Sequence, residues 1–146
     1  MRPTSVVADA NVALKWFHAA GEQEVEQARA LLTRHRDRRL ELYVLDLTSY
    51  ETGNALLRGH ARLDGERVSV VLEALAELCP TITPGPQDLR EACRLAEEHD
   101  LTLYDAAYAA VALRRDAELV TLDDRLLESG LGRRPAELLA RIDDPT

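Results

Sequence analysis

The alternation of short apolar segments with longer helical ones is the feature that most constrains how this chain can fold. The stretches SVVAD (5–9), LELYVLDL (40–47), TITP (81–84) and AELVTLDD (117–124) are typical of strands, and segments with helical periodicity separate them. Strands joined through helices need crossover connections, which favour a mainly parallel sheet with helices on both faces. We therefore predict fold class α/β, as an α/β/α sandwich.

The segments between the strands carry helix signals of different strength. Charged residues with apolar positions at helical spacing predict an exposed amphipathic helix over 22–39, and further helices are predicted over 48–62, after the N-cap residue Asp64, and over 87–99. YDAAYAAVALRR (104–115) has almost no polar face, which predicts a helix buried on most sides. The tail from Leu131 is compatible with either helix or strand.

Length and composition favour one soluble domain. The chain has 146 residues, of which 46% are hydrophobic and 30% charged, and no repeat or linker divides it. We expect a single domain over residues 1–146. No apolar run approaches the roughly 18 residues of a membrane span, and the start lacks a secretory cleavage site, so we expect a cytoplasmic protein without membrane contact.

Charge and cysteine usage exclude some function classes. The formal net charge of −8 argues against a simple basic nucleic-acid binder, although it leaves room for a nuclease whose site holds a divalent metal. Cys79 and Cys93 form no CxxC motif, and the four histidines show no ligand spacing, so neither a zinc site nor a disulfide framework is indicated. We expect both cysteines to be buried.

Acidic residues recur where predicted strands end and helices begin. Capping explains each one separately: either Asp9 or Asn11 would cap the first helix, and three Thr-to-acid pairs resemble capping boxes, namely Thr48 with Glu51, Thr102 with Asp105, and Thr121 with Asp124. Asp123 precedes Asp124 and doubles the last acid.

Parallel topology makes capping a weaker explanation for the acids taken together, because it places them along one edge of the sheet. Two carboxylates ~5 Å apart repel by about 3 kcal/mol at an effective dielectric near 20. A cap contributes only about 0.5 to 2 kcal/mol. The cluster therefore needs protons or a cation, and carboxylate oxygens are the ligands that Mg²⁺ and Mn²⁺ prefer.

Four segments together resemble the motif blocks of a known family. VVADANVALKWF, LTSYETGNALLR, LTLYDAAYAAVALRR and LVTLDDRLL resemble, in order and approximate spacing, those of the PIN-domain ribonucleases, and most closely the toxin branch of the VapBC type II toxin–antitoxin systems. The resemblance runs from about Ser5 to Leu127. Two positions depart from the family pattern: Asp46 stands where a proline is common, and Asp124 doubles the final acid.

The resemblance implies a fold, a site and partners. It implies a PIN-like sandwich in which Mg²⁺, with Mn²⁺ as a substitute, is bound by Asp9, Glu51, Asp105 and Asp123, with Asn11 and Thr121 orienting ligands or water. The implied activity is endoribonuclease cleavage of RNA by metal-activated water. A cognate VapB-type antitoxin, docking on helices near 22–32 and 47–60, and a homodimer are implied as well.

Three alternatives stay open. The chain could be a PIN nuclease with an RNA-processing role and no antitoxin, or a catalytically silent PIN scaffold that only binds a partner. A receiver-like domain that accepts a phosphoryl group on an acidic edge is disfavoured, because that chemistry needs a late lysine and the only lysine is Lys15.

Overall fold

A central parallel sheet organises the molecule. The structure is a computed structural model that describes residues 2–19 and 23–144. Its strands are β1 (Thr4–Ala8), β2 (Leu40–Leu45), β3 (Thr81–Ile82) and β4 (Glu118–Val120), in the order β3-β2-β1-β4. All three strand pairs are parallel. The predicted mainly parallel sheet is confirmed.

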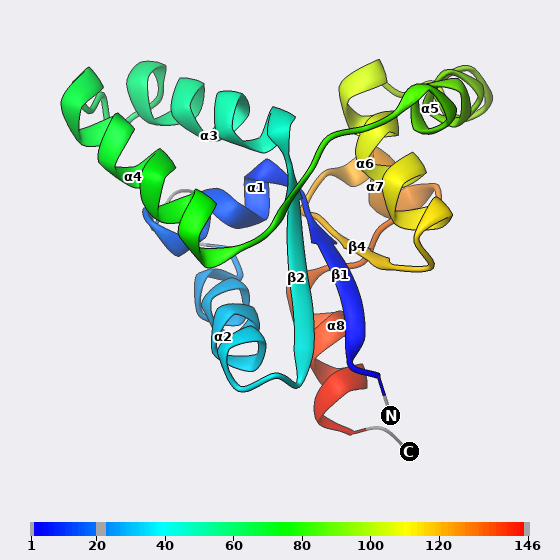
Figure 1. The fold of residues 1–146 in the computed structure, drawn as a ribbon, viewed down its shortest axis with the longest axis horizontal. Coiled ribbons are helices and arrows are strands. Elements are labelled where there is room, and N and C mark those ends of the chain that lie inside the picture. The colour runs from blue at the N-terminus through cyan, green and yellow to red at the C-terminus, as the bar shows by residue number, and fades with distance from the viewer. Residues whose placement is uncertain (1, 20–22, 145–146) are drawn as a thin grey trace.

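Helices cover both faces of this sheet, as predicted. One face carries the short α1 (Ala10–Ala13) and η1 (Leu14–Trp16) together with α2 (Val25–Arg36) and α8 (Pro135–Asp143). The other face carries α5 (Pro86–His99), α6 (Leu103–Arg114) and α7 (Asp124–Glu128). The hairpin of α3 (Asp46–Arg58) and α4 (Gly65–Leu78) and the hairpin of α5 and α6 rise on either side of the carboxyl ends of the strands (Figure 1).

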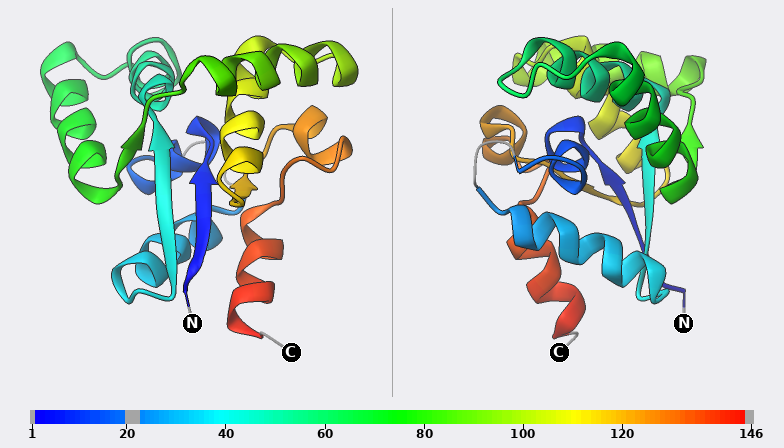
Figure 2. Two further views of the ribbon diagram at one scale, coloured as in Figure 1. Left: turned by 45° about the vertical axis from the view of Figure 1, so that its right-hand side comes forward. Right: turned by 90° about the vertical axis from the view of Figure 1, so that its left-hand side faces the viewer.

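Strand alternation divides the apolar side chains into two cores. Val6 and Leu42 point to the face of α2 and α8, whereas Val7 and Leu45 point to the face of α5 and α6. All four side chains are fully buried. Figure 2 shows the two helical layers with the sheet between them.

Helix α6 is the most buried helix, as its composition predicts. Every residue from 106 to 112 is buried, and most of them are alanine. Small side chains let the helix backbone lie close to the sheet and to α5, with which it makes its most extensive helix contact. The helix therefore holds its amino-terminal residue Asp105 in a fixed place at the sheet edge.

Some predicted boundaries are wrong. Helix α2 ends at Arg36 instead of 39, because Arg38 adopts a left-handed φ of 60° that a helix cannot continue through; its predicted start at Glu22 lies outside the described residues. Helix α3 starts two residues earlier than predicted and ends at Arg58. The ambiguous tail forms a single parallel bridge to β4 through Arg133 before α8 begins.

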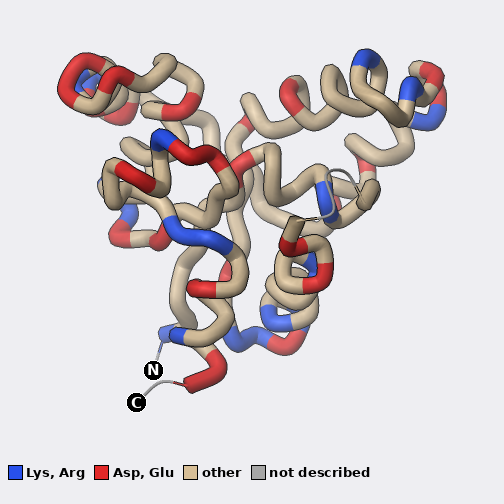
Figure 3. The backbone as a smooth tube through the Cα atoms, turned by 180° about the vertical axis from the view of Figure 1, so that it is seen from behind, with Lys and Arg blue, Asp and Glu red and all other residues tan. Residues whose placement is uncertain are grey.

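The exposure of the cysteines, the length of the helices and the spread of charge complete the description of the fold. Cys79 is buried as expected, but Cys93 is exposed, which corrects the prediction for that residue. No helix among residues 2–19 and 23–144 is long and apolar enough to cross a membrane. In the view of Figure 3, positions of Lys and Arg alternate with positions of Asp and Glu along the chain.

Candidate functional site

The site lies where the connections from the sheet change direction. Chain order runs from β1 to β2 to β3 on one side, while β4 lies on the other side of β1. Asp9 follows β1 and Asp123 follows β4, and the amide of Asp9 bonds the carbonyl of Val120 at 3.0 Å. Such a switch point at the carboxyl ends of parallel strands is the usual ligand site of open α/β sheets.

Thr121 connects the first and last acids. Its Oγ1 donates to Asp9 Oδ2 at 2.8 Å and accepts from the Asp123 amide at 3.0 Å. Asn11 reinforces this arrangement: its Nδ2 lies 3.4 Å from Asp9 Oδ2 and from Thr121 Oγ1, and its Oδ1 accepts from the Leu122 amide. Asn11 and Thr121 therefore hold the Asp9 carboxylate in one orientation.

Asp9 is buried, and its side chain does not cap a helix. It occupies the N-cap position of α1, yet its side chain makes no capping hydrogen bond, and it is only 4% exposed. The capping explanation is therefore wrong for its side chain. The pKa of Asp9 is raised to about 7, mainly by burial; the hydrogen bond from Thr121 opposes this rise, and the charges of Glu51 and Asp105 contribute to it.

Glu51 is held by Tyr108, which the sequence did not single out, and Tyr108 is in turn held by Thr48. The fully buried Tyr108 donates from its hydroxyl to Glu51 Oε1 at 2.8 Å, and Thr48 Oγ1 lies 2.8 Å from the same hydroxyl. The predicted Thr48–Glu51 capping box is wrong, because Thr48 lies inside α3 and accepts from the Leu45 amide. Burial raises the pKa of Glu51, and the charge of Asp105 adds to this.

Asp105 and Asp123 complete the set from two helix starts. Thr102 caps α6, because its side chain accepts a hydrogen bond from the Asp105 amide. The Thr102 part of the predicted Thr102–Asp105 capping box is therefore confirmed. Burial raises the pKa of Asp105, and the charge of Asp123 adds to it. The predicted Thr121–Asp124 box is wrong, because Asp123 itself caps α7 by accepting from the Leu126 amide.

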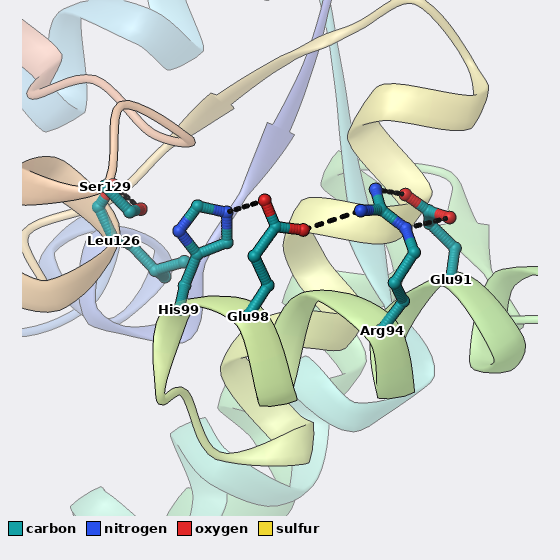
Figure 4. Close-up of polar contacts among 6 residues, drawn as sticks. All are labelled: Glu91, Arg94, Glu98, His99, Leu126 and Ser129. Atoms are coloured by element: carbon teal, nitrogen blue, oxygen red, sulfur yellow. Dashed lines mark hydrogen bonds and ion pairs between the residues drawn. The ribbon is translucent and has the colours of Figure 1, made fainter.

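Several other acids are paired with arginine, but these four are not within the described residues. Asp88 contacts Arg114 and Arg115, and Glu91 and Glu98 flank Arg94 on the exposed face of α5 (Figure 4). Within the described residues, no ion pair within 4.0 Å involves Asp9, Glu51, Asp105 or Asp123. Their negative charge is therefore left to a proton or to a cation from solution.

The four carboxylates influence one another without converging on one point. In the part of the chain that the structure describes, no three His, Cys, Asp or Glu side chains are close enough together to hold a metal ion. Like charges without a cation between them repel, which accounts for the open arrangement. The donor set is nevertheless all oxygen and includes a buried carboxylate without a cationic partner, so its chemistry fits Mg²⁺ or Mn²⁺.

A second hollow lies elsewhere on the molecule. It has a volume of about 600 Å³ at the amino-terminal end of the strands, and Arg2, Tyr43 and Asp116 are among its lining residues. None of the four acids lines it. Because its lining has mixed charge and includes none of the four acids, the acidic edge remains the candidate site.

Two residues of the site were missed from the sequence. Tyr108 follows Asp105 by one helical turn in YDAAYAA and reads as a core residue, since nothing in the local pattern shows that its hydroxyl meets Glu51. Thr48 reads as a helix cap, since nothing in the local pattern shows that its hydroxyl meets the hydroxyl of Tyr108. The signal for both is a polar atom on an otherwise apolar, buried surface, which needs a partner.

Comparison with known proteins identifies this architecture. The profile of the PIN domain matches residues 6–130. The chain belongs to the PIN-domain family. The predicted resemblance to this nuclease family is confirmed, and the match begins just before the first acid and extends past the last.

Relatives of this PIN domain include proteins named as VapC nucleases. Ribonuclease VapC3 of Pyrobaculum aerophilum is 37% identical over 112 residues, which span 73% of this chain and 82% of the relative. Exonuclease VapC9 of the same organism is 38% identical over 112 residues, 75% of this chain and 80% of that relative. The crystal structure of PAE2754 from Pyrobaculum aerophilum superposes with a TM-score of 0.71 at 30% identity, covering 97% of this chain and 98% of its own.

Proposed function

We propose that this PIN domain is a divalent-metal-dependent endoribonuclease that acts as the toxin of a VapBC-type pair. Its metal ligands are Asp9, Glu51, Asp105 and Asp123. The observation that carries the proposal is that these acids come from four separate segments, that their charges act on one another, and that none of them forms an ion pair within the described residues. Mg²⁺ is the proposed cofactor, with Mn²⁺ able to replace it.

Each side chain has a part in this proposal. A bound Mg²⁺ would lower the pKa of a water and neutralise charge on the scissile phosphate. Thr121 and Asn11 orient Asp9, and Tyr108 orients Glu51. Asp123 is fixed by its capping bond to α7. No histidine or serine nucleophile is needed, since water attacks the phosphorus.

The experiment is RNA cleavage by the purified protein and by its Asp9→Asn variant. With Mg²⁺ the parent should cut RNA, and EDTA should stop it. Asp9→Asn should lower the cleavage rate by at least about 100-fold, by analogy with loss of one transition-state-stabilising group. Asp124→Asn is the matched control, because this neighbouring acid has an 83% exposed side chain and pairs with Arg134 at 3.9 Å.

The result that contradicts the metal assignment is cleavage by Asp9→Asn at the parental rate. Far-UV circular dichroism of both variants shows whether the fold is intact. If the parent cuts no RNA but binds Mn²⁺ and a partner protein, the chain is the silent binding scaffold instead.

A circular RNA separates the endonuclease from the exonuclease, which matters because one relative is named an exonuclease. An endonuclease linearises a closed circle, whereas an exonuclease has no end to start from. We expect the circle to be opened at internal positions. Shortening of linear RNA from one end, with the circle left intact, would replace the endonuclease assignment.

The antitoxin is proposed to cover the α3–α4 hairpin. Tyr50 and Leu57 on α3 and Val70 on α4 are exposed by 78%, 37% and 59%. Exposed apolar side chains on neighbouring helices suit an amphipathic partner segment. We expect a small DNA-binding antitoxin to be encoded beside this chain. Val70→Glu should weaken binding to this neighbour, and Leu89→Glu on α5 is the matched control.

Failure of that neighbour to bind the parent protein would favour the RNA-processing alternative without an antitoxin.

A homodimer in the cytoplasm completes the proposal. Sedimentation equilibrium of the purified protein tests the dimer.

A further inference from the structure

We propose that Gly132 is a positioning residue for Asp9. It acts through Thr121, because the space left by its missing side chain fixes the orientation in which the Thr121 hydroxyl reaches Asp9. As far as it concerns metal binding, this inference rests on the proposed function. Gly132 lies just beyond the residues that match the PIN-domain profile, in the segment that bridges β4.

Space, and not backbone conformation, requires a glycine at this position. Gly130 is the glycine with a positive φ, 78°, among the described residues, and a Cβ there would meet nothing within 4 Å. A Cβ on Gly132 would lie 2.5 Å from Thr121 Cγ2. Its other neighbours, Leu119 Cδ2 and the Leu119 carbonyl, would both be at an ordinary 3.6 Å. The single clash is therefore with the Thr121 methyl.

The Gly132 segment cannot move away without breaking hydrogen bonds, because such bonds join it to the β4 segment on both sides of Val120. The Thr121 amide donates to the Arg133 carbonyl at 2.9 Å, and the Arg133 amide donates to the Leu119 carbonyl at 2.9 Å. The Gly132 amide also donates to the Leu126 carbonyl at 3.1 Å. Retreat of the segment would break several of these bonds.

Thr121 has only one orientation that serves the site. Its methyl lies against Gly132 while its Oγ1 contacts Asp9 Oδ2 and the Asp123 amide. A β-branched side chain has few staggered positions, so a methyl pushed by a new Cβ takes the hydroxyl away with it. The Asp9 carboxylate would then lose its 2.8 Å hydrogen bond and keep the longer 3.4 Å contact from Asn11.

A pair of substitutions separates this effect from a general disturbance. Gly132→Ala introduces the clash. Thr121→Ser keeps the hydroxyl and removes the methyl that the new Cβ would strike. We therefore expect Gly132→Ala to weaken Mn²⁺ binding by about 10-fold or more, as loss of a group that orients a ligand does. Thr121→Ser in the same chain should restore the affinity to that of Thr121→Ser alone.

Isothermal titration with MnCl₂ measures these affinities on the full chain, and a crystal structure of Gly132→Ala without metal shows the geometry directly. We expect Thr121 Oγ1 in that crystal to lie beyond hydrogen-bond distance of Asp9. Thr121→Val, which keeps the shape and lacks the hydroxyl, should weaken Mn²⁺ binding even if Gly132→Ala does not fold.

Parental Mn²⁺ affinity in Gly132→Ala or in Thr121→Val would overturn the inference. It would also be overturned if Gly132→Ala and its double variant with Thr121→Ser were equally weak, because the damage would then lie in the backbone. A parent that binds no Mn²⁺ defeats the proposed function instead. The crystal structure then decides the inference alone, and a Thr121 that keeps both contacts would refute it.

Discussion

Tyr108 donates its buried hydroxyl to Glu51 Oε1 at 2.8 Å and thereby ties α6 to α3 beneath the acidic edge. A carboxylate only accepts, so the Tyr108 oxygen must itself accept from the Thr48 hydroxyl. Thr48 in turn accepts from the Leu45 amide at the end of β2. A one-way chain of three hydrogen bonds therefore runs from the sheet to Glu51, and burial raises the pKa of the Tyr108 phenol, which keeps it a neutral donor.

Removing the end of this chain should loosen the metal site. Tyr108→Phe keeps the ring in the core and deletes only the donor to Glu51, so we expect Mn²⁺ affinity to fall by about 10-fold or more. The matched control is Thr52→Val: this neighbouring buried hydroxyl has no hydrogen-bond partner among the described residues. Thr52→Val should leave the affinity unchanged. Equal affinities of Tyr108→Phe and the parent, measured by calorimetry, would show that Glu51 needs no such support.

The two adjacent acids after β4, Asp123 and Asp124, have different roles. Asp123 caps α7 and its charge acts on Asp105, whereas Asp124 points to solvent with an 83% exposed side chain. We predict that Asp123→Asn weakens Mn²⁺ binding by about 10-fold or more, while Asp124→Asn changes it by less than about twofold. Titration calorimetry of both variants checks this. Stronger damage from Asp124→Asn would reverse the assignment.

The fold was predictable from the sequence because its pattern is local. Short apolar strands separated by helical segments require crossovers, and the alanine-rich helix from 103 to 114 could be placed inside from composition alone. The four acids were found because parallel strands bring their ends to one edge. The connection of Asp9 to Asp123 through Thr121 at the β1–β4 switch point depends on strand order, which no local pattern specifies.

The supporting residues were not predictable for a physical reason. Thr48 and Thr121 stand three residues before an acid, and this spacing is the same for a capping box as for a contact made across the sheet. Only the observed distances distinguish the two: Thr121 reaches Asp9, 112 residues away in sequence. Gly132 likewise reads as a turn residue until its closeness to Thr121 is known.

His35 should stabilise the fold through its backbone contacts. Its Nδ1 accepts from the Leu42 amide at 3.0 Å, and its Nε2 lies 3.0 Å from the Leu78 carbonyl, so Nε2 carries the proton and donates. The ring thus joins α2 to β2 and α4. We expect His35→Ala to lower the free energy of unfolding by about 1 to 3 kcal/mol. His60→Ala, at an exposed position, is the control for urea unfolding, and equal losses in both variants would contradict this role.

Asp9 should make the metal-free protein less stable as pH rises. Its pKa is about 7 in the folded chain against an ordinary 3.8, mainly because of burial. The folded state therefore holds this proton more tightly than the unfolded state between about pH 4 and pH 7. The stability that protonated Asp9 contributes is fully present below about pH 4 and is lost as pH rises through about 7, by a few kcal/mol in total. Glu51 and Asp105 act in the same direction, since their pKa values are also raised.

Urea unfolding in EDTA at a series of pH values measures this dependence. Asp9→Asn, which carries no charge at any of these pH values, should lose most of the decline, while Asp124→Asn should keep it. At pH 8, Mg²⁺ should stabilise the parent and leave Asp9→Asn nearly unchanged, because a cation that binds only the folded state raises the free energy of unfolding. A decline of the same size in Asp9→Asn would mean that the pH dependence comes from other groups and that Asp9 is not the buried charge a metal must neutralise.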